Sequence, residues 1–127
     1  MKHFVICLSL LIFMATPFTV LAVDTVDFEM KTTKNLLNLC TASPEDNLYA
    51  EAVNFCHGYL IGAYHYYESS RKGPNAQSQI CISEPKPSRN DTIDMFVKWA
   101  KANKQYHNEL PVETEFRFLM ETWPCSH

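Results

Sequence analysis

The fold is decided by residues 43–70, whose sequence is SPEDNLYAEAVNFCHGYLIGAYHYYESS. Apolar side chains recur there at the three- and four-residue spacing that places them on one face of a helix. Ser43 and Asp46 have the spacing of a capping box with a shorter acid, and Pro44 suits the first helical position. The pattern predicts one long helix with a buried stripe formed by Leu48, Ala52, Phe55, Cys56, Tyr59, Leu60 and Ala63.

Two glycines, Gly58 and Gly62, lie about one turn apart within this predicted helix. Each costs roughly 1 kcal/mol of helix propensity relative to alanine. Such a cost suggests that another backbone or a large aromatic ring packs closely against the helix here. The alternative is a long core helix with two weak positions.

The first 22 residues have the pattern of a secretory signal peptide. Lys2 and His3 precede an apolar run from Phe4 to Phe13, and the segment closes with Val20-Leu21-Ala22, which has the pattern of a small-residue cleavage site. A membrane anchor is the alternative, but the apolar run is shorter than the ~20 residues that span a bilayer. The sequence therefore predicts cleavage after Ala22, which leaves residues 23–127 as a single exported domain.

The charge balance excludes two classes of partner. The formal net charge is −3, with 11 basic and 14 acidic residues. A nucleic-acid-binding domain has a basic patch, and a protein held on anionic lipid has a polybasic run. Neither pattern is present, so the sequence predicts no nucleic-acid partner and no membrane association after cleavage.

Cysteines provide the next constraint. Cys7 belongs to the predicted signal peptide, which leaves Cys40, Cys56, Cys81 and Cys125 in the exported domain. Four cysteines in a small exported domain predict two disulfides. Zinc is the alternative, but no two of these cysteines have the close spacing of a structural zinc site.

Shorter helices are predicted on both sides of residues 43–70. One runs from Thr33 to about Thr41, after an opening segment expected to be frayed. Another begins near Asp91, where Ser88 and Asp91 repeat the capping spacing, and the last runs from Pro111 to Trp123. No segment alternates with the period of a strand. The predicted fold is all-α, a small four-helix disulfide-bonded domain.

Loop lengths favour one of the three possible cysteine pairings. A short connection over residues 41–45 predicts antiparallel neighbouring helices, which brings Cys40 beside Cys56. Residues 71–90 form a long loop that a bridge from Cys81 to Cys125 would hold in place. We expect these two disulfides.

No catalytic set is evident in the sequence. The serines do not form a Gly-x-Ser-x-Gly elbow, and no nucleophile has an obvious base. His57 and His65 stand eight residues apart, too far along a helix to chelate one ion. We therefore predict a protein that is not an enzyme and that has no metal or cofactor.

Four tyrosines, Tyr59, Tyr64, Tyr66 and Tyr67, crowd the second half of the predicted long helix. One face of the helix can serve the core. The remaining rings would then form an exposed aromatic surface, which in soluble proteins marks an interface. Tyrosines used only in the core are the alternative.

The ordered set of features resembles a known family. The features are a leucine-rich helix ending at Cys40, the motif FCHGYLIGA at residues 55–63, Cys81, a helix start at Leu110-Pro111 and the ending Trp123-Pro124-Cys125. Together they resemble the Rap/Tai immunity proteins of bacterial type VI secretion systems, which are antidotes to secreted peptidoglycan amidases. The resemblance implies a small periplasmic helical protein, often a homodimer, that blocks a cognate amidase effector by occupying its active-site cleft. A more distant likeness to the small acid-stress chaperones of the periplasm provides an alternative function.

Inhibition by a helical frame needs a projecting segment that fills the groove of the enzyme. The predicted partner-binding loop consists of Lys104, Gln105, Tyr106, His107, Asn108 and Glu109. Tyr106 is the expected anchor, although it could instead fasten the third helix to the fourth. The loop around Cys81 is the other candidate.

Overall fold

The structure is a computed structural model that describes residues 22–126. Its helices are the 3-10 helix η1 (Thr25–Glu29), α1 (Thr33–Cys40), α2 (Tyr49–Ser70), α3 (Arg89–Ala102), the 3-10 helix η2 (Lys104–Tyr106) and α4 (Pro111–Thr122). No strand occurs between residues 22 and 126, where Ile80 and Pro124 form only an isolated bridge. The predicted all-α fold with four helices is confirmed. The predicted signal peptide, apart from Ala22, lies outside the described residues.

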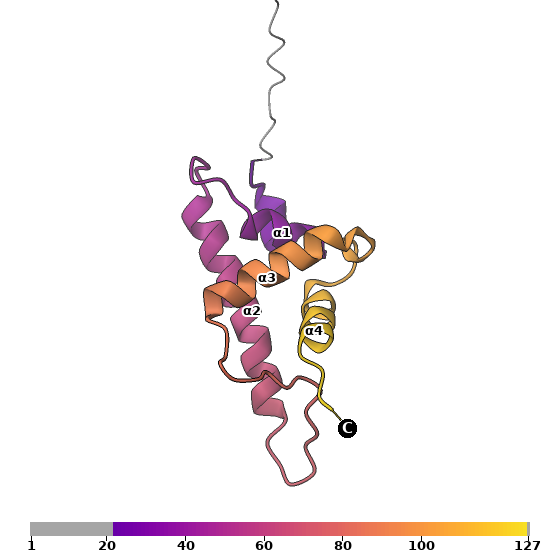
Figure 1. Cartoon of the computed structure of the whole chain (residues 1–127). Coiled ribbons are helices and arrows are strands. Elements are labelled where there is room, and N and C mark those ends of the chain that lie inside the picture. The colour runs from indigo at the N-terminus through magenta and orange to yellow at the C-terminus, as the bar shows by residue number, and fades with distance from the viewer. Residues whose placement is uncertain (1–21, 127) are drawn as a thin grey trace, which may run out of the picture.

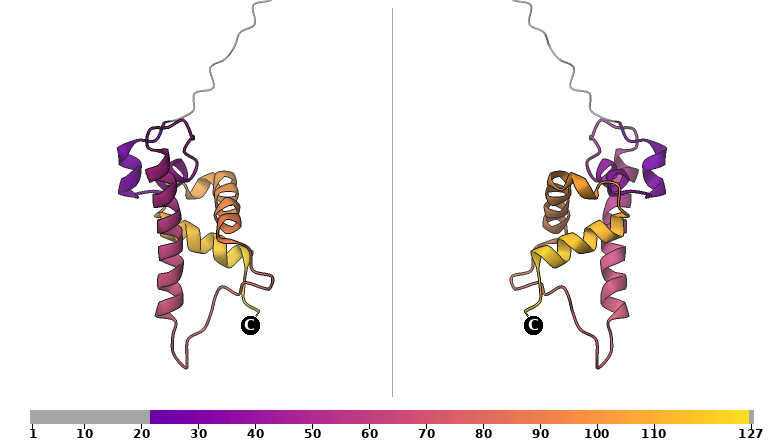
Figure 2. Two further views of the ribbon diagram at one scale, coloured as in Figure 1. Left: turned by 90° about the vertical axis from the view of Figure 1, so that its left-hand side faces the viewer. Right: turned by 90° about the vertical axis from the view of Figure 1, so that its right-hand side faces the viewer.

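Helix α2 is the column on which the other helices are arranged (Figure 1). Figure 2 shows α3 and α4 on one side of α2, while the loop after α2 runs beyond its end and returns toward the C-terminus. The core lies where these helices meet. Its buried apolar side chains are Leu36, Leu37, Leu39, Ala52, Cys56, Leu60, Ile80, Ile93, Phe96, Ala100, Phe118 and Leu119.

Local capping chemistry fixes two of the helix starts that the sequence predicts. The Ser88 hydroxyl accepts a hydrogen bond from the Asp91 N–H at 3.2 Å, and the Asp91 carboxylate accepts from the Ser88 N–H at 3.3 Å. This capping box begins α3, and Pro111 occupies the first position of α4. Both starts need only neighbouring residues, which is why the sequence alone identifies them.

The predicted start of α2 near Pro44 is wrong, because the helix begins at Tyr49. Ser43 and Asp46 therefore do not form the predicted capping box at the start of this helix. The Asp46 carboxylate instead accepts hydrogen bonds from the Val23 N–H at 2.7 Å and the Leu48 N–H at 2.8 Å. The first of these bonds connects the start of the folded domain to the α1–α2 connection.

The opening segment, expected to be frayed, forms η1 and is tied to α1. Asp27 is buried, and its Oδ1 accepts hydrogen bonds from Asn35 Nδ2 at 2.9 Å and Asn38 Nδ2 at 3.0 Å. Phe28 packs edge-on against Phe55 of α2, with ring centroids 5.4 Å apart. The expectation of fraying is therefore wrong, because these contacts come from residues distant in sequence.

Gly58 and Gly62 do not pack against a close neighbour. Both are exposed, and a Cβ added at either position would meet no described atom within 4 Å beyond its two chain neighbours and the nearby backbone of its own helix. The expected tight packing is therefore wrong for the single chain. The homodimer implied by the family resemblance stays a prediction.

Two disulfides form the predicted pairs. Cys40 at the end of α1 is bonded to Cys56 of α2, with Cα atoms 5.2 Å apart. Cys81 in the long loop is bonded to Cys125 near the end of the chain, with Cα atoms 5.0 Å apart. The first disulfide joins neighbouring helices, and the second closes the loop onto the segment that follows α4.

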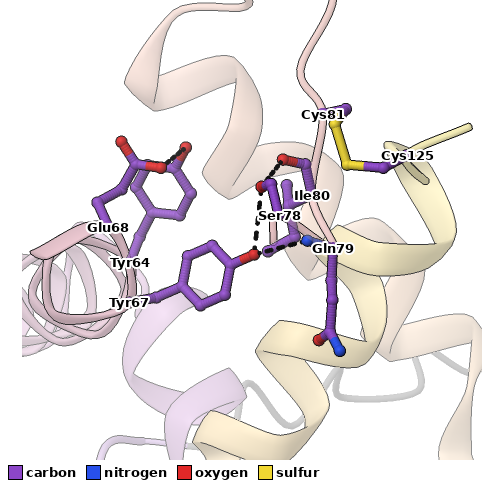
Figure 3. The surroundings of a disulfide bond; sticks show 8 residues. All are labelled: Tyr64, Tyr67, Glu68, Ser78, Gln79, Ile80, Cys81 and Cys125. Carbon is purple, nitrogen blue, oxygen red and sulfur yellow. Dashed lines mark hydrogen bonds between the residues drawn. A yellow bond between two sulfur atoms is a disulfide. The ribbon is translucent and has the colours of Figure 1, made fainter. Parts of the chain in front are cut away.

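The long loop is also held by a tyrosine of α2 (Figure 3). The Tyr67 hydroxyl accepts a hydrogen bond from the Gln79 N–H at 3.0 Å and lies 3.4 Å from the Ser78 hydroxyl. The Cys81 N–H donates to the Trp123 carbonyl oxygen at 2.8 Å. Hydrogen bonds to α2 and to the end of α4 thus assist the disulfide in ordering this loop.

Most of the tyrosine cluster serves the core. Tyr59, Tyr64 and Tyr67 are half-buried and pack on the core, and the Tyr67 ring lies 5.2 Å from that of Phe116. Tyr66 alone of the four is largely exposed, at 75%. The core alternative is therefore correct for three of the four rings.

Among the described residues, no helix has the length and apolarity that crossing a membrane requires.

Candidate partner-binding site

The predicted partner-binding loop connects α3 to α4 and contains η2. Its six residues divide into two groups. The side chains of Lys104, Gln105 and Asn108 are exposed. Tyr106, His107 and Glu109 are partly buried. The structure thus places the expected anchor, Tyr106, in the group that contacts the protein itself.

Tyr106 contacts both an aromatic ring of α3 and a cation of α4. Its ring stacks on Trp99 of α3, with centroids 5.6 Å apart and planes 10° from parallel. The guanidinium carbon of Arg117 in α4 lies over the Tyr106 ring, 4.4 Å from the ring centroid. Tyr106 therefore fastens α3 to α4, which is the alternative role that the sequence left open.

His107 and Glu109 bind neighbouring helices. Nε2 of His107 lies 2.9 Å from the Ala100 carbonyl oxygen, so this nitrogen carries the proton and donates. The Glu109 carboxylate accepts from Arg117 at 3.1 Å, and this bond raises the pKa of Arg117. Both side chains therefore position the loop.

The loop backbone is tied to a third helix. The Thr33 N–H donates to the Glu109 carbonyl oxygen at 2.8 Å, and the Lys34 N–H donates to that of His107 at 3.0 Å. These donors are in the first turn of α1, whose N–H groups have no partner within the helix. The loop thus satisfies the N-terminus of α1, and its conformation is fixed from three sides.

Sequence reasoning missed three residues of this site. Trp99 and Arg117 contact the Tyr106 ring, and Leu110, which follows the loop, is 51% exposed. The eight-residue spacing of Glu109 and Arg117 gives no local signal, because Glu109 precedes α4 and the contact depends on how the chain enters that helix. No local signal identifies Trp99 as the stacking partner.

Tyr106→Ala is expected to destabilise the protein by about 2 kcal/mol, because it removes both the stacking on Trp99 and the cation–π contact with Arg117. Thermal denaturation measures this as a lower Tm. The control is Gln105→Ala, an exposed neighbour whose change should alter stability by no more than about 0.5 kcal/mol. An unchanged Tm for Tyr106→Ala would contradict the role described here.

A cavity of about 300 Å³ forms a second candidate site. It lies between the second half of α2, residues 82–87, α3 and α4. Apolar side chains form most of its wall: Leu60, Ile61, Ile82, Pro87, Ile93, Phe96, Phe118 and Leu119. Polar side chains complete it: Tyr64, His65, Glu68, Lys86, Arg89, Thr92 and Glu115.

Glu115 is the unusual member of this wall. It is only 4% exposed, and burial raises the pKa of its carboxyl to about 9. The carboxyl is therefore protonated at neutral pH. The sequence does contain a signal for it, because Glu115 falls at helical spacing between Val112 and Leu119 in the apolar stripe of α4.

His57 and His65 belong to no metal-binding cluster in the part of the chain that the structure describes. His57 and His65 lie on α2, where His57 is partly buried and His65 is exposed. Among residues 22–126, no group of three or more His, Cys, Asp or Glu side chains is placed to hold a metal ion.

A comparison with protein families identifies the chain. The family model for Rap1a immunity proteins matches residues 32–125. Searches of curated proteins and of solved structures find no match. The matched range begins at Thr32, which caps α1, and ends at Cys125 of the second disulfide, so it spans all four α-helices and the loop described above. The chain belongs to the Rap1a immunity protein family, as its resemblance to the Rap/Tai immunity proteins predicts.

Proposed function

We propose that this immunity protein acts in the periplasm, where it binds a type VI secretion peptidoglycan amidase and blocks the active-site cleft of that enzyme. Membership of the Rap1a immunity protein family is the observation that carries the proposal. An immunity protein binds a cognate effector, so its action is stoichiometric and requires affinity instead of turnover. The disulfide-bonded helical frame supports such a role, because a rigid binder loses little conformational entropy on association.

The exposed side chains of the loop at residues 104–109 are the proposed contacts. Gln105 and Asn108 carry carboxamides, the group that an amidase cleft accommodates, and Lys104 adds a cation. Tyr106 and its neighbours hold the loop from within, so the three exposed side chains are presented by a fixed backbone. Positioning of this kind favours tight binding.

Alanine substitution of Lys104, Gln105 and Asn108 together is expected to weaken binding to the cognate amidase at least tenfold, or about 1.4 kcal/mol. The Tm should not change, because these side chains are exposed. Isothermal titration calorimetry measures the affinity. The enzyme to use is the periplasmic amidase whose toxicity the wild-type protein suppresses in cells.

The matched control replaces Lys72, Asn75 and Gln77 by alanine. These residues have the same three side-chain types and are exposed in the loop after α2. If the control and not the first variant weakens binding, the contact surface is the loop near Cys81. If the wild-type protein suppresses no amidase but prevents aggregation of many clients at low pH, it is an acid-stress chaperone and the proposed function is rejected.

Export with cleavage after Ala22 is part of the proposal, and one contact supports it. The Val23 N–H donates to the Asp46 carboxylate at 2.7 Å, and this bond lowers the pKa of Asp46. Cleavage before Val23 would convert that amide into an α-ammonium group. The new charge would then lie beside a carboxylate that is already in place.

The mature protein is expected to begin at Val23, which intact-mass measurement of periplasmic extracts can determine. Asp46→Asn should lower the Tm of the mature protein at pH 7. Because the folded-state pKa of Asp46 is depressed, the difference in Tm between Asp46→Asn and the wild-type protein should shrink as the pH falls below about 4. A mature chain with a different first residue, or equal Tm values at pH 7, would contradict this assignment.

A further inference from the structure

The cavity between α2, α3 and α4 is separate from the loop proposed to bind the amidase. None of the residues 104–109 lines it. Its volume of about 300 Å³ lies at the lower end of the range for small-molecule sites. Its walls combine a mainly apolar surface with seven polar or charged side chains, and such sites also join an apolar wall to placed polar groups.

Glu115 supplies an unsatisfied group in this cavity. Its Oε2 atom is buried and has no hydrogen-bond partner among the described residues. A buried polar atom without a partner is costly, and an apolar residue of similar size would fill the wall without that cost. Binding of a ligand therefore explains a glutamate at position 115 better than packing of the core does.

We propose that the cavity binds a primary alkylammonium ion, with its aliphatic stem against the apolar walls and its ammonium group on the Glu115 carboxylate. Leu60, Ile93, Phe96, Phe118 and Leu119 provide the apolar contact for the stem. An ammonium group has three donors and no acceptor, so it satisfies the buried carboxyl oxygen and compensates its charge.

Other simple ligands fit this wall less well. An alkyl carboxylate could accept one hydrogen bond from the protonated Glu115 carboxyl, but it would bring a second acid into a mainly apolar wall. An alcohol could donate one hydrogen bond to Glu115 but would not stabilise the ionised form. The ammonium ion alone combines an apolar stem with a charge opposite to that of the carboxylate.

Binding has a consequence for protons. The raised pKa keeps the empty site protonated at pH 7, so an incoming ammonium ion must displace the Glu115 proton into solvent. The apparent affinity should then rise about tenfold per pH unit below pH 9. The other titratable or charged groups near Glu115 or at the cavity are Tyr59, Tyr64, His65, Glu68, Lys86 and Arg89.

The test uses the mature protein and pentylamine as the probe, with pentan-1-ol and pentanoate as uncharged and anionic analogues. Calorimetry at pH 6, 7 and 8 should show one pentylamine per chain, with affinity rising about tenfold per pH unit. A second arm of the test uses Nα-acetyl-lysine N-methylamide, which has a free side-chain ammonium group and no charged backbone groups. Binding of this probe as well as pentylamine identifies a protein lysine as the source of the ammonium, and binding of pentylamine alone identifies a small amine.

Three variants make the result specific. E115Q keeps the size of the side chain but cannot ionise, and it should lower pentylamine affinity at pH 8 at least tenfold. E113Q removes an exposed acid from the same helix and should leave the affinity unchanged. H65Q removes the titratable ring at the rim and should retain the pH dependence.

Several outcomes would overturn the proposal: no saturable pentylamine binding, equal binding by E115Q, or tighter binding of pentanoate than of pentylamine. The amidase affinity of E115Q provides an independent reading. This variant should still bind the amidase through residues 104–109. The amine affinity of E115Q therefore tests the cavity proposal. The amidase affinity of the variant with alanine at Lys104, Gln105 and Asn108 tests the proposed function separately.

Discussion

Replacing Cys81 and Cys125 together by serine is expected to lower the free energy of unfolding by about 4 kcal/mol in the chain-entropy description of disulfides. These cysteines are 44 residues apart in sequence, so the bond restricts a large part of the unfolded chain. Native proteins are stable by only about 5–15 kcal/mol, so this loss is a large fraction of the whole. Urea denaturation under non-reducing conditions measures it.

The second disulfide provides the matched comparison. Cys40 and Cys56 are 16 residues apart, and the same description gives about 3 kcal/mol for the variant with serine at both positions. The Cys81 and Cys125 variant should therefore be the less stable of the two. The reverse order would mean that local packing around Cys56, which is fully buried, contributes more than loop length.

The parts of the fold that sequence predicts well depend on local chemistry. Ser88 and Asp91 cap α3 through hydrogen bonds between residues three apart, and Pro111 begins α4 through its own fixed geometry. The cysteine pairing follows from loop length, which is also a property of the chain itself. Each of these features can be read without knowing the tertiary structure.

The parts that sequence does not predict depend on distant partners. Asp46 has the spacing of a capping residue, but its carboxylate accepts a hydrogen bond from the N–H of Val23, 23 residues earlier in the chain. Tyr106 has the position of an exposed loop residue, but its ring stacks on Trp99 and contacts Arg117. In each case the side chain could serve two roles, and packing decides between them.

The cavity was missed for a related reason. Helical periodicity places Glu115 in the apolar stripe of α4, but periodicity does not distinguish a buried acid from an acid at the edge of the stripe. Only the positions of Leu60 and Phe96, on two other helices, reveal that the carboxyl lies in an apolar cavity. An acid within an apolar stripe is therefore a signal that requires the tertiary structure for its interpretation.

The burial of Glu115 also predicts an unusual dependence of stability on pH. In the unfolded chain this carboxyl ionises near pH 4.5, whereas in the folded protein it ionises only at about 9. Between these values the unfolded state binds fewer protons than the folded state, so stability falls as the pH rises. The contribution of this group is fully present below pH 4.5, declines by about 1.4 kcal/mol per pH unit and is lost through pH 9.

Glu115→Gln is therefore expected to stabilise the protein at pH 7 by about 3 kcal/mol, because glutamine keeps the side-chain volume and does not ionise. Urea denaturation of both proteins at pH 5, 6, 7 and 8 should give curves that diverge with rising pH. Glu113→Gln, an exposed acid on the same helix, should follow the wild-type protein within about 0.5 kcal/mol at each pH. A constant difference between Glu115→Gln and the wild type would show that Glu115 ionises normally in the folded protein. Divergence would instead mean that at neutral pH the protein retains a destabilising acid in its core, a cost that a bound cation would offset.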